Sequence, residues 1–146
     1  MLQDYHWNWL DKTMEFNKSG YNWFFLRTAD GIQGLCITFH PKKSVLQNVN
    51  IFYIEYLSSA PWNRYSPLHE RQYKGIGNEI IKQVQYYFLE KHQYSYGFSL
   101  QSLQQARGFY EHIGMVYIPG HNDDDGLFFY EMSKGNALSF LEGKNA

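Results

Sequence analysis

The sequence of 146 residues has one cysteine, no long hydrophobic run and no dense run of lysine and arginine. A single cysteine excludes a disulfide bond within the chain. Cys36 lies in a short apolar run, which predicts a buried side chain rather than a nucleophile. No stretch approaches the ~20 apolar residues of a membrane span, and the first residues lack the pattern of a signal peptide. We therefore expect a cytoplasmic protein without membrane association.

The charges nearly balance, with 13 Lys and Arg against 14 Asp and Glu and a formal net charge of −1. Binding along a nucleic-acid backbone requires a concentrated basic face, so the sequence predicts no nucleic-acid partner. A small anionic ligand needs only a local site and is not excluded. Hydrophobic residues make up 44% of the chain and aromatic residues 19%, which is typical of a globular protein. The length fits a single domain spanning 1–146.

The spacing of apolar residues predicts helices at 3–17, 76–91 and 102–113. Apolar runs bounded by turn residues predict strands at 21–28, 32–39, 49–57, 94–100, 115–118 and 127–132. Loops are expected at 40–44 and 58–71, and the tail 133–146 is expected to fray. A strand–helix–strand unit beside antiparallel hairpins predicts an α/β fold, in which helices flank a mixed sheet of about six strands.

Local signals mark the ends of several elements. Asp30-Gly31 between two apolar runs predicts a hairpin turn. Ser102 and Gln105 match a capping box, in which the serine hydroxyl accepts a hydrogen bond from an early backbone N–H of the helix. Gly114 follows the last periodic residue and predicts the end of that helix.

The stretch 72–78, Gln-Tyr-Lys-Gly-Ile-Gly-Asn, runs directly into the helix predicted at 76–91. The start of a helix offers unpaired backbone N–H groups and the positive end of the helix dipole. Glycines at such a place let a phosphate reach the backbone without meeting a Cβ atom. The stretch therefore indicates a site for a phosphorylated ligand, and it is equally consistent with a loop that requires positive φ.

A second motif follows the first. Gln-x-x-Gly-x-Gly at 72–77 precedes Ala-Arg-Gly-Phe-Tyr-Glu-His-Ile-Gly-Met at 106–115. Over 21–132 the sequence resembles the GNAT superfamily of acyl-CoA-dependent N-acyltransferases. Their pyrophosphate loop is written Arg/Gln-x-x-Gly-x-Gly/Ala, and their later helix often reads Ala-x-x-Phe-Tyr-Glu-x-x-Gly-Phe. Two motifs in the right order, with the right elements between them, carry the resemblance.

The resemblance implies a binding site for acetyl-CoA and no metal. The backbone of 57–59 would pair with the pantetheine amides where the strand at 49–57 splays from the strand at 94–100. The amides of 73–78 would hold the pyrophosphate at the helix start. The residues implied in cofactor binding are Leu57, Ser58, Ser59, Gln72, Tyr73, Lys74, Gly75, Ile76, Gly77, Asn78, Ser102, Phe109 and Tyr110.

The implied reaction transfers an acetyl group directly to a primary amine in a ternary complex, because Cys36 is not placed to form an acyl-enzyme. Tyr110 matches the family's tyrosine that protonates the thiolate leaving group, and is assigned as general acid. Glu55 is the candidate base. The strand at 49–57 is otherwise apolar on both faces, which predicts a central strand where burial raises the pKa of Glu55. A water chain as the base, or a Glu55 that faces solvent, remains open.

The sequence departs from the family pattern in several places, which include a longer link at 61–71. Leu103 stands where many relatives have a cofactor-contacting asparagine, for which Ser102 could substitute. The family's first strand and one of its first two helices have no clear counterpart, so a homodimer partner could complete the wall that binds the acceptor. That acceptor is an unidentified small-molecule or peptide amine. A catalytically degenerate acyl-CoA-binding or regulatory module is the alternative, whereas a dinucleotide fold is disfavoured because 72–78 lacks Gly-x-Gly-x-x-Gly.

Overall fold

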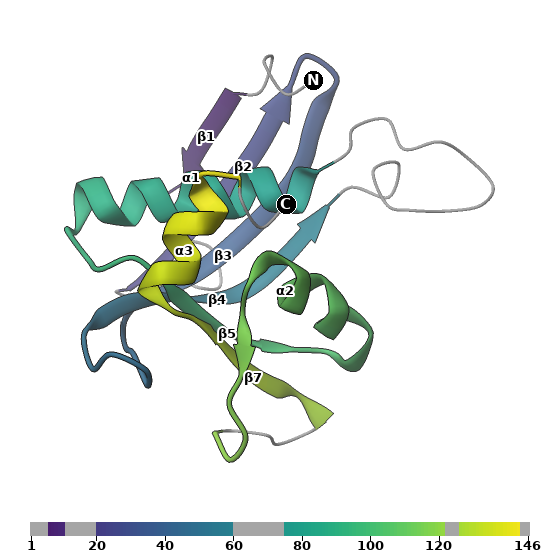
Figure 1. Ribbon diagram of the computed structural model, residues 1–146. Coiled ribbons are helices and arrows are strands. Elements are labelled where there is room, and N and C mark those ends of the chain that lie inside the picture. The colour runs from purple at the N-terminus through teal and green to yellow at the C-terminus, as the bar shows by residue number, and fades with distance from the viewer. Residues whose placement is uncertain (1–5, 11–19, 60–74, 122–125, 144–146) are drawn as a thin grey trace.

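The computed structural model describes residues 6–10, 20–59, 75–121 and 126–143, which form a mixed sheet with helices packed against it (Figure 1). The strands are β1 (His6–Leu10), β2 (Tyr21–Thr28), β3 (Gly31–Lys43), β4 (Asn50–Ser59), β5 (Phe98–Ser102), β6 (Val116–Tyr117) and β7 (Phe128–Met132). The helices are α1 (Ile76–Lys91), the short 3-10 helix η2 (Gln104–Ala106), α2 (Arg107–Ile113) and α3 (Lys134–Leu141). The predicted α/β class is confirmed.

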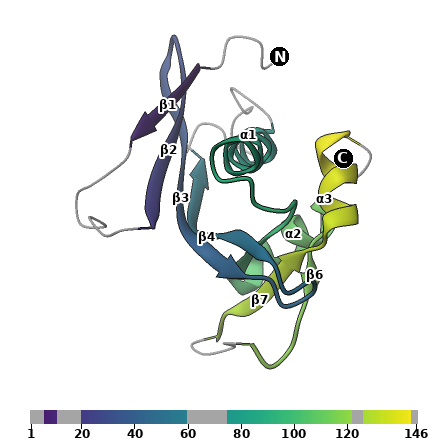
Figure 2. The same ribbon diagram turned by 90° about the vertical axis from the view of Figure 1, so that its left-hand side faces the viewer.

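Within the described residues the sheet has seven strands in the order β1-β2-β3-β4-β5-β7-β6. Neighbouring strands are antiparallel except β4 and β5, which run parallel. A parallel pair requires a crossover connection, and α1 lies in the connection between β4 and β5 and packs on β3 and β4. Figure 2 shows α1 and α3 on the same side of β2 and β3.

The N-terminal segment differs from its sequence prediction. The helix predicted at 3–17 is wrong for 6–10, which form β1 and pair with β2, with Trp7 opposite Leu26. Trp7 and Trp9 also fit a period of two, and aromatic residues favour strands, so pairing with β2 outweighs a weak helical spacing. β1 is an additional strand beyond the predicted six.

The core lies between the sheet and α1 and is rich in aromatic rings. Phe88 of α1 stacks on Phe52 of β4 with 4.6 Å between ring centroids, and Phe52 stacks on Phe98 of β5 at 5.2 Å. All three side chains are fully buried. Cys36 is also fully buried, as predicted, and burial raises the pKa of its thiol. The thiol therefore stays protonated, which disfavours a nucleophilic role.

Gly34 in β3 allows α1 to approach the sheet closely. A Cβ atom on Gly34 would lie 2.5 Å from Ile80 Cδ1, 3.0 Å from Ile76 Cγ2 and 3.1 Å from the Ser58 carbonyl oxygen. Both isoleucines are buried in the close-packed core, so they have little room to move aside.

We expect Gly34→Ala to lower the free energy of unfolding by ~2 kcal/mol, because the added methyl group overpacks the contact with α1. Urea denaturation measures the change. Gly135→Ala is the matched control, since its Cβ would meet no atom within 4 Å, and it should change stability by less than ~0.5 kcal/mol. Equal effects of the two substitutions would contradict a tight contact at Gly34.

The turn between β3 and β4 is held by a buried carboxylate on β7. Glu131 is 1% exposed and accepts hydrogen bonds from the Ser44 hydroxyl, from the Val45 N–H at 2.9 Å and from the Leu46 N–H at 3.2 Å. The Ser44 hydroxyl in turn accepts from the Gln47 N–H at 2.9 Å. Since β5 lies between β4 and β7 in the sheet, these contacts tie the start of β4 to a strand that it does not pair with.

The loop predicted at 40–44 is largely strand, because β3 extends to Lys43. Pro41 has no N–H to give to a ladder, and it falls at an irregularity where the pairing with β4 shifts between Phe39 and Lys42. The hairpin predicted at Asp30-Gly31 is confirmed, since β2 and β3 pair on either side of it.

Two C-terminal boundaries also differ. The strand predicted at 94–100 is found four residues later as β5, because 93–97 connect α1 to the sheet with the Gly97 N–H donating to Gln85 Oε1 at 2.9 Å. The tail predicted to fray from 133 instead forms α3. Ser133 is its N-cap and accepts from the Asn136 N–H at 3.2 Å, and α3 buries two side chains in the core.

Candidate functional site

Strands β4 and β5 pair over a short distance and then separate. The paired residues are Phe52 with Phe98, Tyr53 with Ser99 and Ile54 with Leu100. Beyond them β4 continues beside β3 to Ser59, and β5 continues beside β7 to Ser102. Figure 1 shows the two strands diverging, with α2 in the angle between them. The predicted splay is confirmed, because beyond Ile54 and Leu100 the two strands no longer pair with each other.

Leu57, Ser58 and Ser59 lie on the separated part of β4 and are half-buried. One edge of their backbone pairs with residues 34–36 of β3. The other edge borders the opening between β4 and β5. An extended backbone beside such an opening can pair with an extended ligand, as it would with an added strand.

Glu55 does not have the buried environment predicted for it. It is the extra residue of β4 where the pairing shifts between Ile37 and Thr38 of β3. Such a bulge twists the strand and re-aims side chains, and both Glu55 and Tyr56 are exposed. The predicted burial is therefore wrong, and β4 is not covered on both faces along its whole length. The pKa of Tyr53 is raised to about 12, mainly by burial and to a smaller extent by the charge of Glu55.

Helix α1 begins at the glycine turn, as predicted. Gly75 is the N-cap with φ 74°, and its carbonyl accepts a hydrogen bond from the Glu79 N–H at 3.0 Å. The N–H groups of 76–78 therefore precede the first helical hydrogen bond and are directed out of the helix start. The first three residues of the predicted loop, Gln72, Tyr73 and Lys74, lie outside the described residues.

Helix α2 contacts the start of α1 at Gly77. A Cβ atom on Gly77 would lie 3.2 Å from Phe109 Cζ, so the ring fits closely because Gly77 has no side chain. In the same turn of α1, Asn78 Oδ1 is buried and receives no hydrogen bond from the described part of the chain. The structure thus brings the N–H groups of a helix start, an aromatic ring and a buried side-chain oxygen to one place.

Tyr110 lies on the side of α2 that faces the core, where it packs against the buried cluster. The pKa of Tyr110 is raised to about 12, mainly by burial and to a smaller extent by the neighbouring Cys36. A phenol with this pKa is protonated throughout the physiological pH range. Its hydroxyl is therefore able to donate a proton or a hydrogen bond.

Ser102 and Leu103 do not form the predicted start of a helix. Ser102 ends β5, is 1% exposed, and donates its hydroxyl to the Leu103 carbonyl at 2.7 Å. Leu103 precedes η2 and is exposed, and α2 itself begins only at Arg107. The predicted capping box with Gln105 is wrong, because the Ser102 hydroxyl bonds to the next peptide instead of to a helical N–H.

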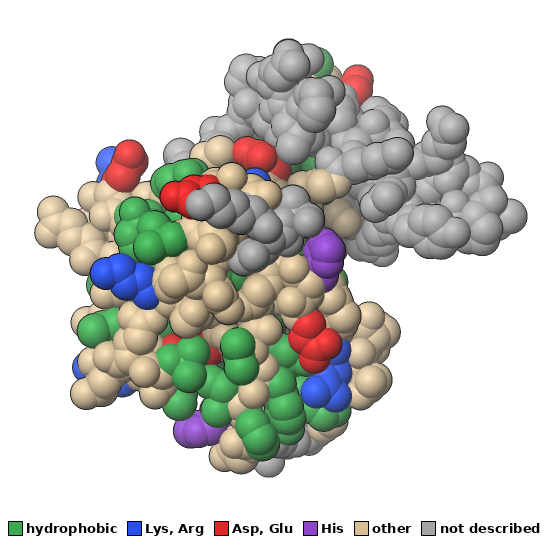
Figure 3. Space-filling view, in the orientation of Figure 1, with side chains coloured by type: hydrophobic (Ala, Val, Ile, Leu, Met, Phe, Trp, Pro, Cys, Tyr) green, Lys and Arg blue, Asp and Glu red, His purple; other side chains and the backbone are tan. Residues whose placement is uncertain are grey.

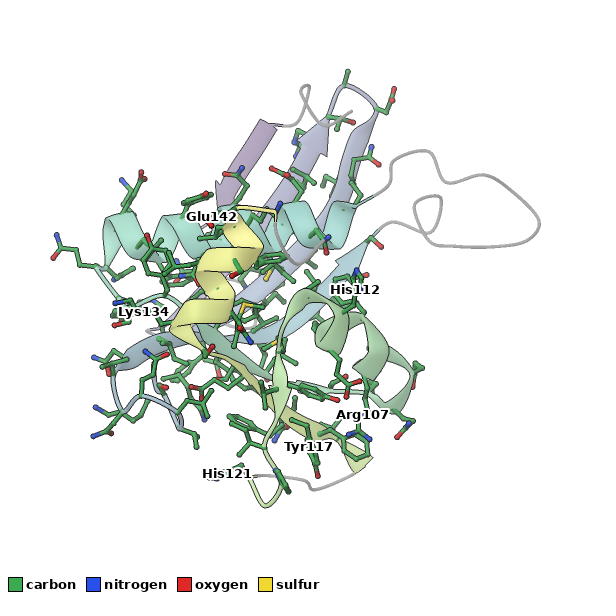
Figure 4. The ribbon with its side chains drawn as sticks, in the orientation of Figure 1. Arg107, His112, Tyr117, His121, Lys134 and Glu142 are labelled. Atoms are coloured by element: carbon green, nitrogen blue, oxygen red, sulfur yellow. The ribbon has the colours of Figure 1, made fainter. Side chains whose placement is uncertain are left out.

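A polar cluster between α2 and β7 was not foreseen from the sequence. The Tyr130 hydroxyl accepts from Arg107 Nε at 2.9 Å and donates to Glu111 Oε2 at 2.5 Å. The Arg107 guanidinium lies 3.8 Å from the centroid of the Phe128 ring, and Figure 4 shows it beside Tyr117. The four-residue spacing of Arg107 and Glu111 is a signal in the sequence, because such a pair shares one face of a helix. Their partner on β7 has no such local signal.

Other kinds of site find no support in the described ranges. No three His, Cys, Asp or Glu side chains gather there as a metal ion would require. No helix there has both the length and the hydrophobicity to cross a membrane. On the face shown in Figure 3, Lys and Arg side chains are scattered among acidic ones rather than gathered in one patch.

No family model and no curated protein matches this sequence, whereas solved structures match the fold. A bacterial toxin superposes with a TM-score of 0.61 at 16% identity, over 84% of this chain and 72% of the toxin. A proposed acetyltransferase of the GNAT family from Desulfovibrio desulfuricans has a TM-score of 0.56 at 15% identity, over 78% and 69%. The PaiA N-acetyltransferase from Thermoplasma acidophilum, solved with coenzyme A, has a TM-score of 0.55 at 14% identity, over 78% and 61%.

The chain has the fold of the GNAT superfamily. The parallel pair that separates, the helix that begins at the glycine turn and the short later helix occur here in the order that the resemblance implies. The resemblance is thus confirmed at the level of the fold.

Proposed function

We propose that this protein is an N-acetyltransferase that moves an acetyl group from acetyl-CoA to a primary amine by direct attack in a ternary complex. The observation that carries the proposal is the separation of β4 from β5 beside the start of α1. Extended backbone beside two separating strands suits the amides of pantetheine, and a helix start suits a pyrophosphate. The two features fit two parts of one coenzyme. PaiA, which shares the fold, is solved with coenzyme A.

On this proposal the pantetheine lies along the backbone of Leu57–Ser59, on the side of the opening between β4 and β5. The pyrophosphate is held by the N–H groups of 76–78, with 72–74 completing the loop. Gly77 supports this assignment, because a side chain there would crowd both Phe109 and an approaching phosphate. Asn78 supports it as well, because its buried Oδ1 offers an acceptor to an amide or hydroxyl of a ligand.

Acetyl-CoA supplies the thioester, and side chains of this protein accept and donate the protons that the reaction transfers. The amine must be neutral to attack, so its proton passes to Glu55 or to water. The new C–N bond forms at the carbonyl carbon as the C–S bond breaks, and Tyr110 gives its proton or a hydrogen bond to the departing thiolate. The nitrogen loses its second proton to solvent as the amide forms, and solvent returns a proton to Tyr110. The exposure of Glu55 favours a route in which the amine proton reaches solvent, directly or through this carboxylate.

We infer an acceptor amine that carries positive charge before it reacts. The exposed Glu55 lies beside the opening, and a carboxylate there attracts cations. Small-molecule and peptide amines both fit this description.

The exposure of Glu55 also favours one second candidate, which is an acyl-CoA-binding module without turnover. A general base must lie within hydrogen-bond reach of the proton that it removes, and the fold does not hold an exposed side chain in one position. In this case the coenzyme occupies the same site, and no amine becomes acetylated.

Titration with acetyl-CoA, CoA and NAD in parallel, by thermal shift and calorimetry, tests the proposal. We expect saturable binding of acetyl-CoA and CoA and none of NAD. At a hundredfold excess of ligand over Kd, binding adds ~2.7 kcal/mol of stability and raises the melting temperature. Absence of CoA binding at millimolar ligand would reject the site. Binding without acetylation of any amine in a screen would favour the module.

Gly77→Ala should weaken CoA binding on the order of tenfold, which corresponds to ~1.4 kcal/mol. The added Cβ would lie 3.2 Å from Phe109 Cζ and would reduce the space at the helix start. Gly135→Ala serves as the control, because it adds the same atom at the start of α3 in open space. Calorimetry with CoA measures both variants. Equal affinity of Gly77→Ala and the wild type would contradict phosphate binding at this turn.

A further inference from the structure

Three consecutive residues of α2 contact three different parts of the fold. Phe109 lies against Gly77 at the start of α1. Tyr110 packs against the buried core. Glu111 accepts a hydrogen bond from Tyr130 of β7. A small rotation of α2 would therefore move the candidate acid Tyr110 relative to the opening between β4 and β5.

Helix α2 has little intrinsic support for its position. It spans seven residues, its N-cap Ala106 provides no side-chain hydrogen bond, and Ile113 is its one buried residue. Helices of this length are unstable in isolation, so contacts with the rest of the protein must hold it. At its C-terminal end, Asn136 Nδ2 donates to the Gly114 carbonyl at 2.8 Å.

Tyr130 provides the corresponding contact near the N-terminal end. Its side chain is fully buried, and β7 pairs on both sides, with β5 and with β6. Its hydroxyl bonds to Arg107 and Glu111, which lie one helical turn apart on the same face of α2. Hydrogen bonds to charged groups are stronger and more directional than neutral ones. A single buried hydroxyl thus fixes two points on a short helix.

We propose that Tyr130 is a positioning residue, which fixes the rotation of α2 through Arg107 and Glu111 and thereby places Tyr110 at the site of acetyl transfer. The inference rests on the proposed function, in which Tyr110 is the acid. The Tyr110 and Tyr130 ring centroids are 6.5 Å apart, and Glu111 directly follows Tyr110 in the chain. The effect of Tyr130 therefore passes through the helix.

The kinetic test replaces Tyr130 by phenylalanine in the wild type and in Tyr110→Phe. We expect Tyr130→Phe to lower kcat about tenfold, because a small misplacement of a reacting group is costly, and to leave KM for acetyl-CoA within twofold. In the Tyr110→Phe background it should cause no further loss, since both changes then act on the same step. Tyr86→Phe, at an exposed position on α1, is the control. Equal losses in both backgrounds would overturn the inference.

A second measurement does not depend on turnover. Hydrogen exchange of the amides of 107–113 should be at least fivefold faster in Tyr130→Phe and unchanged in Tyr86→Phe. Glu111→Gln, which keeps an acceptor for the Tyr130 hydroxyl at an exposed position, should give a smaller increase. Unchanged exchange in Tyr130→Phe would overturn the inference whatever the activity. Faster exchange in a protein that acetylates no amine would support the contact and reject the proposed function.

Discussion

Replacing Tyr110 by phenylalanine should lower kcat by two to three orders of magnitude and leave the affinity for CoA within about twofold. General acid catalysis typically contributes 10²–10⁴-fold, and on the proposed mechanism the substitution removes the hydroxyl that protonates the thiolate. The ring itself stays, so the packing of α2 against the core is preserved. Release of CoA thiol measures kcat, and calorimetry measures affinity.

The pH profile supplies a control for this prediction. An unshifted phenol loses its proton near pH 10, whereas burial raises the pKa of Tyr110 to about 12. The acid form is therefore present at pH 7 and is lost only as the pH rises through about 12. We expect no decline in kcat between pH 7 and 10 that depends on Tyr110. A kcat for Tyr110→Phe within threefold of the wild type would remove Tyr110 from the chemistry.

Glu131→Ala should lower the free energy of unfolding by ~3 kcal/mol. The substitution removes one buried acceptor and leaves the Ser44 hydroxyl and the N–H groups of Val45 and Leu46 without it. Each partly buried donor that loses its partner costs ~1 kcal/mol or more. Urea denaturation at constant pH measures the difference.

The matched control is Glu90→Ala, which removes a carboxylate from an exposed position on α1 and should change stability by less than ~0.5 kcal/mol. If Glu131→Ala is as stable as this control, the turn between β3 and β4 must be held by other contacts. A slower approach to the folded state would not count against the prediction, because the measurement is made at equilibrium.

The elements whose apolar spacing is strong were predictable from the sequence. Helix α1 buries Ile80, Val84 and Phe88 at the spacing of one helical face, and the Asp30-Gly31 hairpin has a local turn signal. The glycine turn was predictable for the same reason, because a helix start and the positive φ that glycine permits are local properties of the sequence. Each of these features is determined by interactions between residues that are close together in the sequence.

Features set by long-range pairing were not predictable. Trp7 and Trp9 fit either a helix or a strand, and pairing with β2 selects the strand. The exposure of Glu55 arises from a shift of register against β3, which the composition of β4 does not reveal. The contact of Tyr130 with α2 joins residues that are distant in the chain. The splay of β4 from β5 was expected from the family resemblance and not from residue spacing.

The two parts of strand β4 are held differently in the sheet. Its first part lies between β3 and β5 and is tied to β7 by the turn that precedes it, whereas Leu57, Ser58 and Ser59 lie beyond the last pair with β5. We therefore expect the C-terminal end of β4 to open at lower free energy than its start. On the proposed function, coenzyme that pairs with this backbone adds hydrogen bonds at that end. Binding would then slow hydrogen exchange of the amides of 57–59, and part of the binding free energy would go into ordering the end of the strand.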